Sequence, residues 1–166
     1  LLHSTPRTRD VARLLERVLH YLADPATARR LARLYQELVA QEVISSDEED
    51  AALRQRLVML RSLRVDELLF PRAVANAPEL LPSGVAVSER DISALEELAR
   101  LVGRWVRAIH LPVDQLILTV AQDLYGAASG QENVENLAIA HTLAESLHGT
   151  AQMHPGWRLS EFASEL

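Results

Sequence analysis

Arginine side chains near the start of the chain are the residues whose type and spacing could best do chemistry. Arg9, Arg13 and Arg17 follow one another at intervals of four, so a helix would place them along one edge. Guanidinium groups bind phosphate oxygens, and each phosphate neutralised releases counterions, which makes binding depend on salt. The spacing predicts nucleic-acid phosphate contacts at these three arginines. A solvated charged edge, in which Arg13 pairs with Glu16, is the alternative.

Histidine and carboxylate side chains are weaker candidates for a metal or acid–base site. His141 and His148 lie two helical turns apart with Glu145 between them, whereas metal sites usually use tighter spacings. The alternative is that His141 packs among Leu137, Ala138 and Ala144 with one ring nitrogen satisfied, and that His148 lies near a helix end, where a cation is favoured. The four acids at 47–50 point in different directions on a helix and are expected to be solvated. We therefore predict no catalytic, cofactor-binding or metal-binding residue.

Composition excludes several other classes of site. All 17 basic residues are Arg, so the chain has no Lys for a nucleotide-phosphate loop, and its six Gly form neither that loop nor a GxGxxG turn. A GxSxG hydrolase turn is absent as well. The chain has no Cys, which excludes disulfides and thiolate metal sites.

The net charge and the hydropathy of the chain limit which kinds of partner it can have. The formal net charge is −6, which argues against a simple nucleic-acid-binding module. The charge is uneven: residues 1–40 carry seven Arg against four acids, whereas residues 110–166 carry one Arg against seven acids. No apolar run approaches the roughly 20 residues that span a bilayer, and the start does not have the pattern of a signal peptide. We predict no membrane partner and a cytoplasmic location.

Apolar side chains recur at spacings of three and four, the pattern of amphipathic helices. No segment shows the sustained alternation of a strand, so we predict an all-α fold, a compact bundle of about seven helices with no significant sheet. Ser88 followed by Asp91 is typical of a capping box. The predicted helices cover residues 8–23, 26–44, 47–63, 89–110, 113–125, 130–148 and 159–166, with one short helical turn at 65–70.

Particular side chains are expected inside. The clearest apolar stripe runs from Ile92 to Ile109 and includes Trp105, which we therefore place in the core. Trp157 is either a packing anchor or a contact for a neighbouring domain. Ser160 is a candidate cap of the last helix. The helix over 130–148 is predicted to bury Val134, Leu137, Ala138, His141, Ala144 and Leu147.

One segment of the chain differs from the rest in composition and marks a candidate boundary. Residues 71–87 contain three Pro and one Gly without strong periodicity, which predicts a linker between helical segments 1–70 and 88–166. Together these segments are expected to form one accessory domain. The missing initiator Met and an apolar pattern still running at Leu166 favour a piece of a larger chain.

Four stretches of the sequence, which contain LADP, LPVDQL, NVENLAIA and WRLSEF, resemble segments of UvrD/Rep-type superfamily 1 DNA helicases. RDVARLLERVLHYLADPATARRLARLY is similar to a family segment in which a helix ends in L-A-D-P. LPVDQLILTVAQDLYG, NVENLAIAHTLAESL and WRLSEFASEL resemble three later family motifs, in the same order. The resemblance covers most of the chain and leaves residues 71–87 unmatched.

The resemblance implies a role without chemistry of its own. The matched segments fall in the helical 2B-like insertion of the second motor domain, so the chain would be an accessory subdomain that regulates unwinding or positions duplex DNA. ATP and Mg would bind elsewhere in the parent helicase, and the partners would be DNA, through that helicase, and the motor domains of the same chain. No family catalytic residue falls in this chain. A free-standing α-helical adaptor that binds a protein partner through an apolar groove is the alternative.

Overall fold

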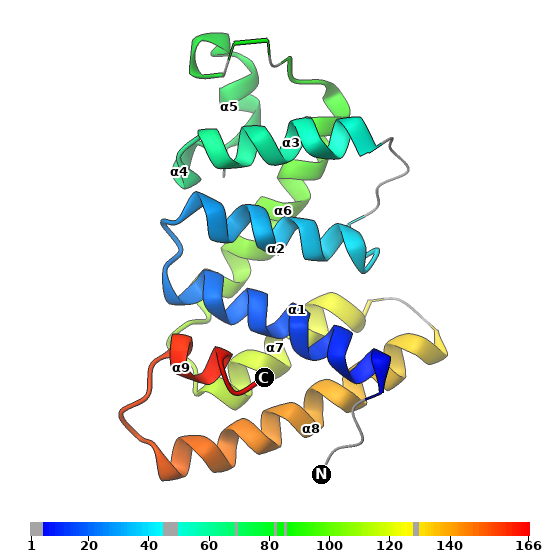
Figure 1. Cartoon of the computed structure of the whole chain (residues 1–166), viewed down its shortest axis with the longest axis vertical. Coiled ribbons are helices and arrows are strands. Elements are labelled where there is room, and N and C mark those ends of the chain that lie inside the picture. The colour runs from blue at the N-terminus through cyan, green and yellow to red at the C-terminus, as the bar shows by residue number, and fades with distance from the viewer. Residues whose placement is uncertain (1–4, 45–49, 69, 82, 85, 128–129) are drawn as a thin grey trace. The chain divides into compact units, whose positions relative to one another are not determined.

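The computed structural model describes residues 5–44, 50–68, 70–81, 83–84, 86–127 and 130–166. Within these ranges the chain is helical and has no strand, which confirms the all-α prediction (Figure 1). The helices are α1 (Pro6–Ala23), α2 (Ala28–Ala40), α3 (Asp50–Ser62), α4 (Val65–Leu68), α5 (Pro71–Ala75), the 3-10 turn η1 (Pro78–Leu80), α6 (Glu89–Arg107), α7 (Val113–Tyr125), α8 (Gln131–Met153) and α9 (Leu159–Ala163).

The chain forms two compact units, and one of them is discontinuous in sequence. Unit 1 combines Leu1–Ala23 with Trp105–Leu166, and unit 2 is the intervening Asp24–Arg104. The predicted linker at 71–87 therefore falls inside unit 2, where it includes α5 and η1. Pro71 occupies the first turn of α5, a position that needs no backbone N–H.

Unit 1 joins the two ends of the chain around an apolar core. α7 packs along α8, and α1 contacts α7, α8 and α9, so that in Figure 1 the blue α1 lies beside the red α9. The apolar stripe of α1 is fully covered at Leu14, Leu15 and Val18. Each such side chain contributes about 1.5–3 kcal/mol by leaving water, which makes α1 a central element of unit 1.

Trp105 anchors unit 1 from the last turn of α6. Its side chain is 0% exposed, and its indole N–H donates to Asp123 Oδ2 at 3.1 Å. This placement confirms the prediction that Trp105 belongs to the core. The predicted stripe fails at its end, because α6 stops at Arg107 and Ile109 is 43% exposed.

Helix α8 differs from its prediction in length and in phase. It runs to Met153, through Gly149, since a glycine inside a helix costs only about 1 kcal/mol relative to Ala. Its buried face is Ala140, Leu143, Ala144 and Leu147, whereas Val134 is 67% exposed and Ala138 and His141 are also exposed. Apolar residues occur around much of this helix, so spacing alone did not select the buried side.

The last helix also starts differently from its prediction. Arg158 is the N-cap residue of α9, where the sequence had suggested Ser160. The carboxylate of Glu161 accepts a hydrogen bond from the Arg158 backbone N–H. That bond satisfies one of the donors that a helix start leaves unpaired.

Unit 2 is held by a buried polar network. The Arg56 side chain is 2% exposed; its Nε and Nη2 lie 2.9 and 2.8 Å from Asp91 Oδ1, and its Nη1 donates to the Tyr35 hydroxyl at 2.8 Å. Asp91 Oδ2 accepts from the backbone N–H and the hydroxyl of Ser88, and the Ser88 hydroxyl accepts from the Asp91 N–H. The predicted capping box is therefore present, and it also carries the buried ion pair that links α2, α3 and α6.

The Asp91 network makes the stability of the chain sensitive to acid. Burial raises the pKa of Asp91, but hydrogen bonds from Ser88 and the Arg56 guanidinium outweigh burial and hold that pKa below its ordinary value. The stabilisation is thus complete above the unfolded-state pKa of about 3.9 and is lost as pH falls through the lower folded-state pKa. We expect the free energy of unfolding to fall less steeply below about pH 4 in Asp91→Asn, which cannot titrate there. Urea unfolding at several pH values checks this, and parallel losses in both proteins would contradict it.

A left-handed residue ends α2. The backbone angle φ of Glu42 is 57°. No other non-glycine residue in the described ranges has a positive φ. The Glu42 N–H donates to Val39 O and the Val43 N–H donates to Leu38 O, which together form a Schellman motif. Glycine is the usual residue at this position, because a side chain there costs energy.

Replacing Glu42 with Gly should stabilise the chain. Relief of the left-handed penalty of about 1–2 kcal/mol exceeds the entropy cost of a glycine, about 0.5–1 kcal/mol, so we expect a net gain of about 0.5 kcal/mol. Urea unfolding measures this gain. Gln41→Gly is the matched control, because Gln41 has φ −98 and should lose stability; equal effects of the two substitutions would refute the assignment.

Candidate nucleic-acid interface

The arginine edge predicted from the sequence lies on α1 in unit 1. Arg9 and Arg13 are exposed and Arg17 is half-buried, since the opposite side of α1 carries the apolar stripe. We refer to Arg9, Arg13 and Arg17 as the arginine edge. Their guanidinium groups have the chemistry to contact a phosphate backbone.

Acidic neighbours engage some of the α1 arginines. Arg13 Nη2 lies 2.7 Å from Asp10 Oδ1, so its carboxylate partner precedes it by one turn and is not the Glu16 that we had considered. Glu16 Oε1 instead lies 3.5 Å from His20 Nε2. Arg7, just before the edge, lies 3.1 Å from a carboxylate oxygen of both Glu132 and Glu135 on α8.

Arg9 and Arg17 differ from these arginines. Their side chains form no ion pair or hydrogen bond with any residue in the described ranges. They are eight residues apart, or about 12 Å along the helix axis. At the two ends of the arginine edge, Arg9 and Arg17 thus have no acidic partner among the described residues, whereas Arg13 at its centre is paired with Asp10.

The histidine pair considered for metal binding lies on the surface of α8. The His141 side chain is 62% exposed, with its Nδ1 3.5 Å from Glu145 Oε1, so the prediction that His141 packs inside is wrong. His148 lies before the final turns of α8, and its Nδ1 is 3.3 Å from Asp114 Oδ2. Across the described part of the chain, no three His, Asp or Glu side chains come together as metal ligands would.

Several carboxylates of unit 1 have structural partners, and the acids at 47–50 lie largely outside the described residues. Asp123 accepts the Trp105 indole hydrogen bond, and Glu132 and Glu135 pair with Arg7. The acids at 47–49 fall outside the described ranges, as does the side chain of Asp50.

Trp157, for which two roles were open, packs within unit 1. Its ring stacks on His154 with centroids 4.3 Å apart and meets the buried Phe162 edge-on at 5.5 Å. Trp157 is half-buried, which fits a packing anchor between the end of α8 and α9.

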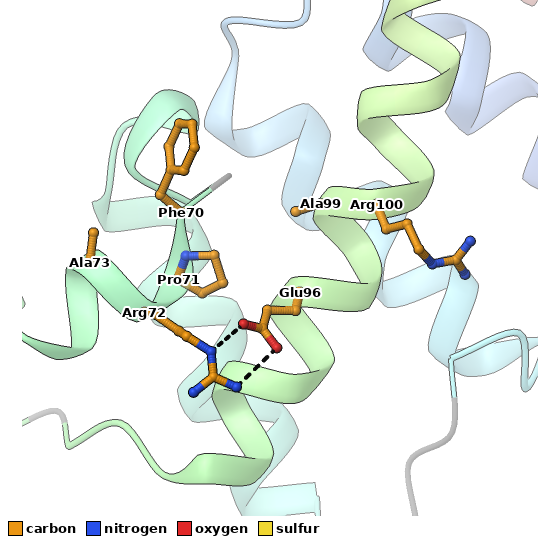
Figure 2. A pocket seen from close by; sticks show the side chains of 7 residues that line it. All are labelled: Phe70, Pro71, Arg72, Ala73, Glu96, Ala99 and Arg100. Carbon is orange, nitrogen blue, oxygen red and sulfur yellow. Dashed lines mark hydrogen bonds and ion pairs between the residues drawn. The ribbon is translucent and has the colours of Figure 1, made fainter.

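A hollow in unit 2 was not predicted from the sequence. It has a volume of about 500 Å³ and lies between the start of α5 and α6 (Figure 2). Phe70, which is 68% exposed, lines it together with Pro71, Ala73 and Ala99. Phe70 precedes a proline, and we had taken it only as the end of a short helical turn, so periodicity gave no reason to expect an exposed aromatic ring beside a groove.

The charged lining of this hollow is largely neutralised. Arg72 Nε donates to Glu96 Oε1 at 2.6 Å, and its Nη1 lies 4.0 Å from Glu89 Oε2. The hydrogen bond and the charge of Glu96 raise the pKa of Arg72 above its ordinary value. Arg100 lines the hollow as well, but Figure 2 shows its guanidinium pointing away from Phe70. The hollow is thus lined by both apolar and charged side chains, and its ion pair with Glu96 makes Arg72 a poor ligand for phosphate.

The three C-terminal stretches behind the helicase resemblance are brought together in unit 1. LPVDQL leads into α7, NVENLAIA lies in α8, and WRLSEF runs into α9. Leu116 and Ile117 of α7 and Phe162 of α9 are buried. In this chain these stretches therefore supply core side chains and helix starts.

None of the described helices is long and apolar enough to cross a membrane. The chain matches no protein-family model, no curated protein and no solved structure.

Proposed function

We propose that this chain is an accessory helical subdomain of an ATP-dependent DNA helicase of the UvrD/Rep type. The observation that carries the proposal is the order of LPVDQL, NVENLAIA and WRLSEF along the sequence. Their positions on helices of one compact unit support it, because a single inserted subdomain would place them in the same unit. The role that follows is to position duplex DNA or to regulate unwinding, while ATP and Mg bind in the motor domains of the parent protein.

Deleting this chain from the parent helicase tests the accessory role. We expect ATP hydrolysis stimulated by single-stranded DNA to persist, because the proposal places no ATPase residue here, and we expect the rate of duplex unwinding to change. The isolated chain should hydrolyse no ATP. Turnover by a clean preparation of the isolated chain, or unchanged unwinding after the deletion, would contradict the proposal.

The second candidate function is a free-standing adaptor that binds a protein partner through an apolar groove. The exposed Phe70 beside the unit 2 hollow favours it, because large exposed aromatic side chains in a concave apolar surface are typical of binding sites. Under this alternative, Phe70→Ala would abolish binding of the protein partner without lowering the stability of the chain. Under the helicase proposal, the same substitution would leave DNA unwinding by the parent protein unchanged.

A further inference from the structure

The hollow of unit 2 combines an apolar surface with an arginine that has no acidic partner among the described residues. Its apolar lining is Phe70, Pro71, Ala73 and Ala99, and its volume is about 500 Å³. That volume lies within the range of pockets in which proteins bind ligands. The side chains around the hollow therefore indicate what kind of partner it fits.

A fixed backbone presents the Phe70 ring to solvent. The ring is 68% exposed, yet the Phe70 N–H donates to Glu67 O at 3.0 Å and the Phe70 carbonyl accepts from the Ala73 N–H at 2.9 Å. Pro71 follows Phe70 and restricts its backbone further. A partner that covers the ring gains the burial of a large apolar surface and has little backbone to order in return. Phe70 thus has the properties of an interface anchor.

The charged side chains of the lining leave one positive charge without compensation. Arg72 donates to both carboxylate oxygens of Glu96, at 2.6 and 3.4 Å, so these two residues neutralise each other. Glu89, the other acid near Arg72, lies outside the lining. The Arg100 side chain forms no ion pair or hydrogen bond with any residue in the described ranges. Because a guanidinium pairs best with a carboxylate, the lining favours an acidic partner over a basic one.

The apolar and charged ends of the hollow are well separated. Figure 2 shows Phe70 and the Arg100 guanidinium on opposite sides, with Ala99 of α6 between them. A ligand that contacts both must extend from the start of α5 across α6, where the small side chain of Ala99 leaves room for it. A peptide segment can place successive side chains at the two ends, whereas a compact molecule covers only one.

We infer that the hollow of unit 2 docks a segment of a partner protein that carries a large apolar side chain and, further along the segment, an acidic residue. The apolar side chain packs against Phe70 and Pro71, and the carboxylate pairs with Arg100. The inference goes beyond the helicase proposal and does not depend on it. It gives the adaptor alternative a partner of defined chemistry.

A phage-displayed library of random peptides tests the inference on the whole chain. We expect selection on the immobilised natural chain to enrich peptides that combine an aromatic or long aliphatic residue with Asp or Glu. The most enriched peptide, synthesised with a fluorescent label, is then the probe for anisotropy titrations. Phe70→Ala should weaken its binding by about 10-fold or more, as expected for the loss of an aromatic anchor. Leu80→Ala is the matched control, because Leu80 is 43% exposed in the same unit but lies outside the lining, and it should leave affinity unchanged.

Reversing one charge tests the acidic part of the inference without altering Phe70. Arg100→Glu should weaken binding of the same peptide. It should also bind a peptide in which Lys replaces the acid more tightly than the natural chain does, because the two reversals restore an opposite-charge pair. Arg90→Glu is the matched control, since Arg90 is exposed on the same helix and lies outside the lining, and it should keep the preference for the acidic peptide.

Four results would overturn the inference. The selection could enrich no peptide, the enriched peptides could lack an acid, Phe70→Ala could bind as tightly as the natural chain, or Arg100→Glu could keep the preference for the acidic peptide. Urea unfolding of each variant separates lost docking from lost folding, and we expect unchanged midpoints because both side chains are exposed. These failures would remove the observation that favours the adaptor and would leave the helicase proposal, which the neighbouring reading frame tests, as it stands.

Discussion

Replacing Asp91 with Ala should lower the free energy of unfolding by about 3 kcal/mol, the largest loss that we expect from a single charged residue. The substitution leaves the Arg56 guanidinium, which is 2% exposed, without its carboxylate partner. A buried charge that loses its partner is more costly than the ion pair is worth. The value lies at the lower end of the usual range because the Asp91 side chain keeps 11% of its exposure, so some water can replace it.

Urea unfolding followed by circular dichroism measures this loss, and a second variant separates its causes. Arg56→Met combined with Asp91→Ala removes both charges, so it should recover more than half of the loss and keep a deficit of about 1 kcal/mol from the broken helix cap. Asp10→Asn, which breaks an exposed pair, should cost less than about 1 kcal/mol. If the double variant were no more stable than Asp91→Ala, the unpaired charge would not be the cause.

Replacing Trp105 with Ala should cost about 3–5 kcal/mol, because the substitution removes the largest fully buried side chain of the chain's described part. The cavity would open in unit 1, and Asp123 would lose the indole N–H that it accepts. Trp105→Phe should cost less, since the ring fills part of the space but cannot donate that hydrogen bond. Urea unfolding of both variants gives the two losses.

Trp157→Ala provides the control for the Trp105 prediction. Trp157 is half-buried and contacts His154 and Phe162, so its truncation should cost about 1–2 kcal/mol, well below the loss at Trp105. Equal losses at the two tryptophans would contradict the assignment of Trp105 as the core anchor.

Much of the fold follows from local patterns, and the errors have identifiable causes. The stripe of α1, the capping box at Ser88 and the burial of Trp105 were predictable because each depends on residues close together in sequence. Arg56 was missed because arginines are rarely buried unless paired, and its partner lies 35 residues away. The buried face of α8 was predicted only in part: Ala144 and Leu147 are buried as expected, but apolar residues surround much of this helix, and only contact with α7 and α1 selects the buried side.

The sequence was enough to select the residues of the arginine edge, but not to show which of their side chains are paired with acids. Intervals of four place Arg9, Arg13 and Arg17 on one edge, and the structure keeps them there. Which of them are neutralised depends on side-chain geometry, including the choice of Asp10 over Glu16 as the partner of Arg13. The Phe70 hollow depends on how α5 lies against α6, which no spacing in the sequence encodes.

The reading frame on both sides of this chain tests the central claim most directly. A helicase accessory subdomain must be continuous with its motor, so we expect a GxxxxGK[ST] phosphate loop upstream and further motor motifs downstream in the same frame. A frame that begins and ends with this chain, or that continues into sequence without a nucleotide-binding motif, would contradict the helicase proposal and favour the adaptor.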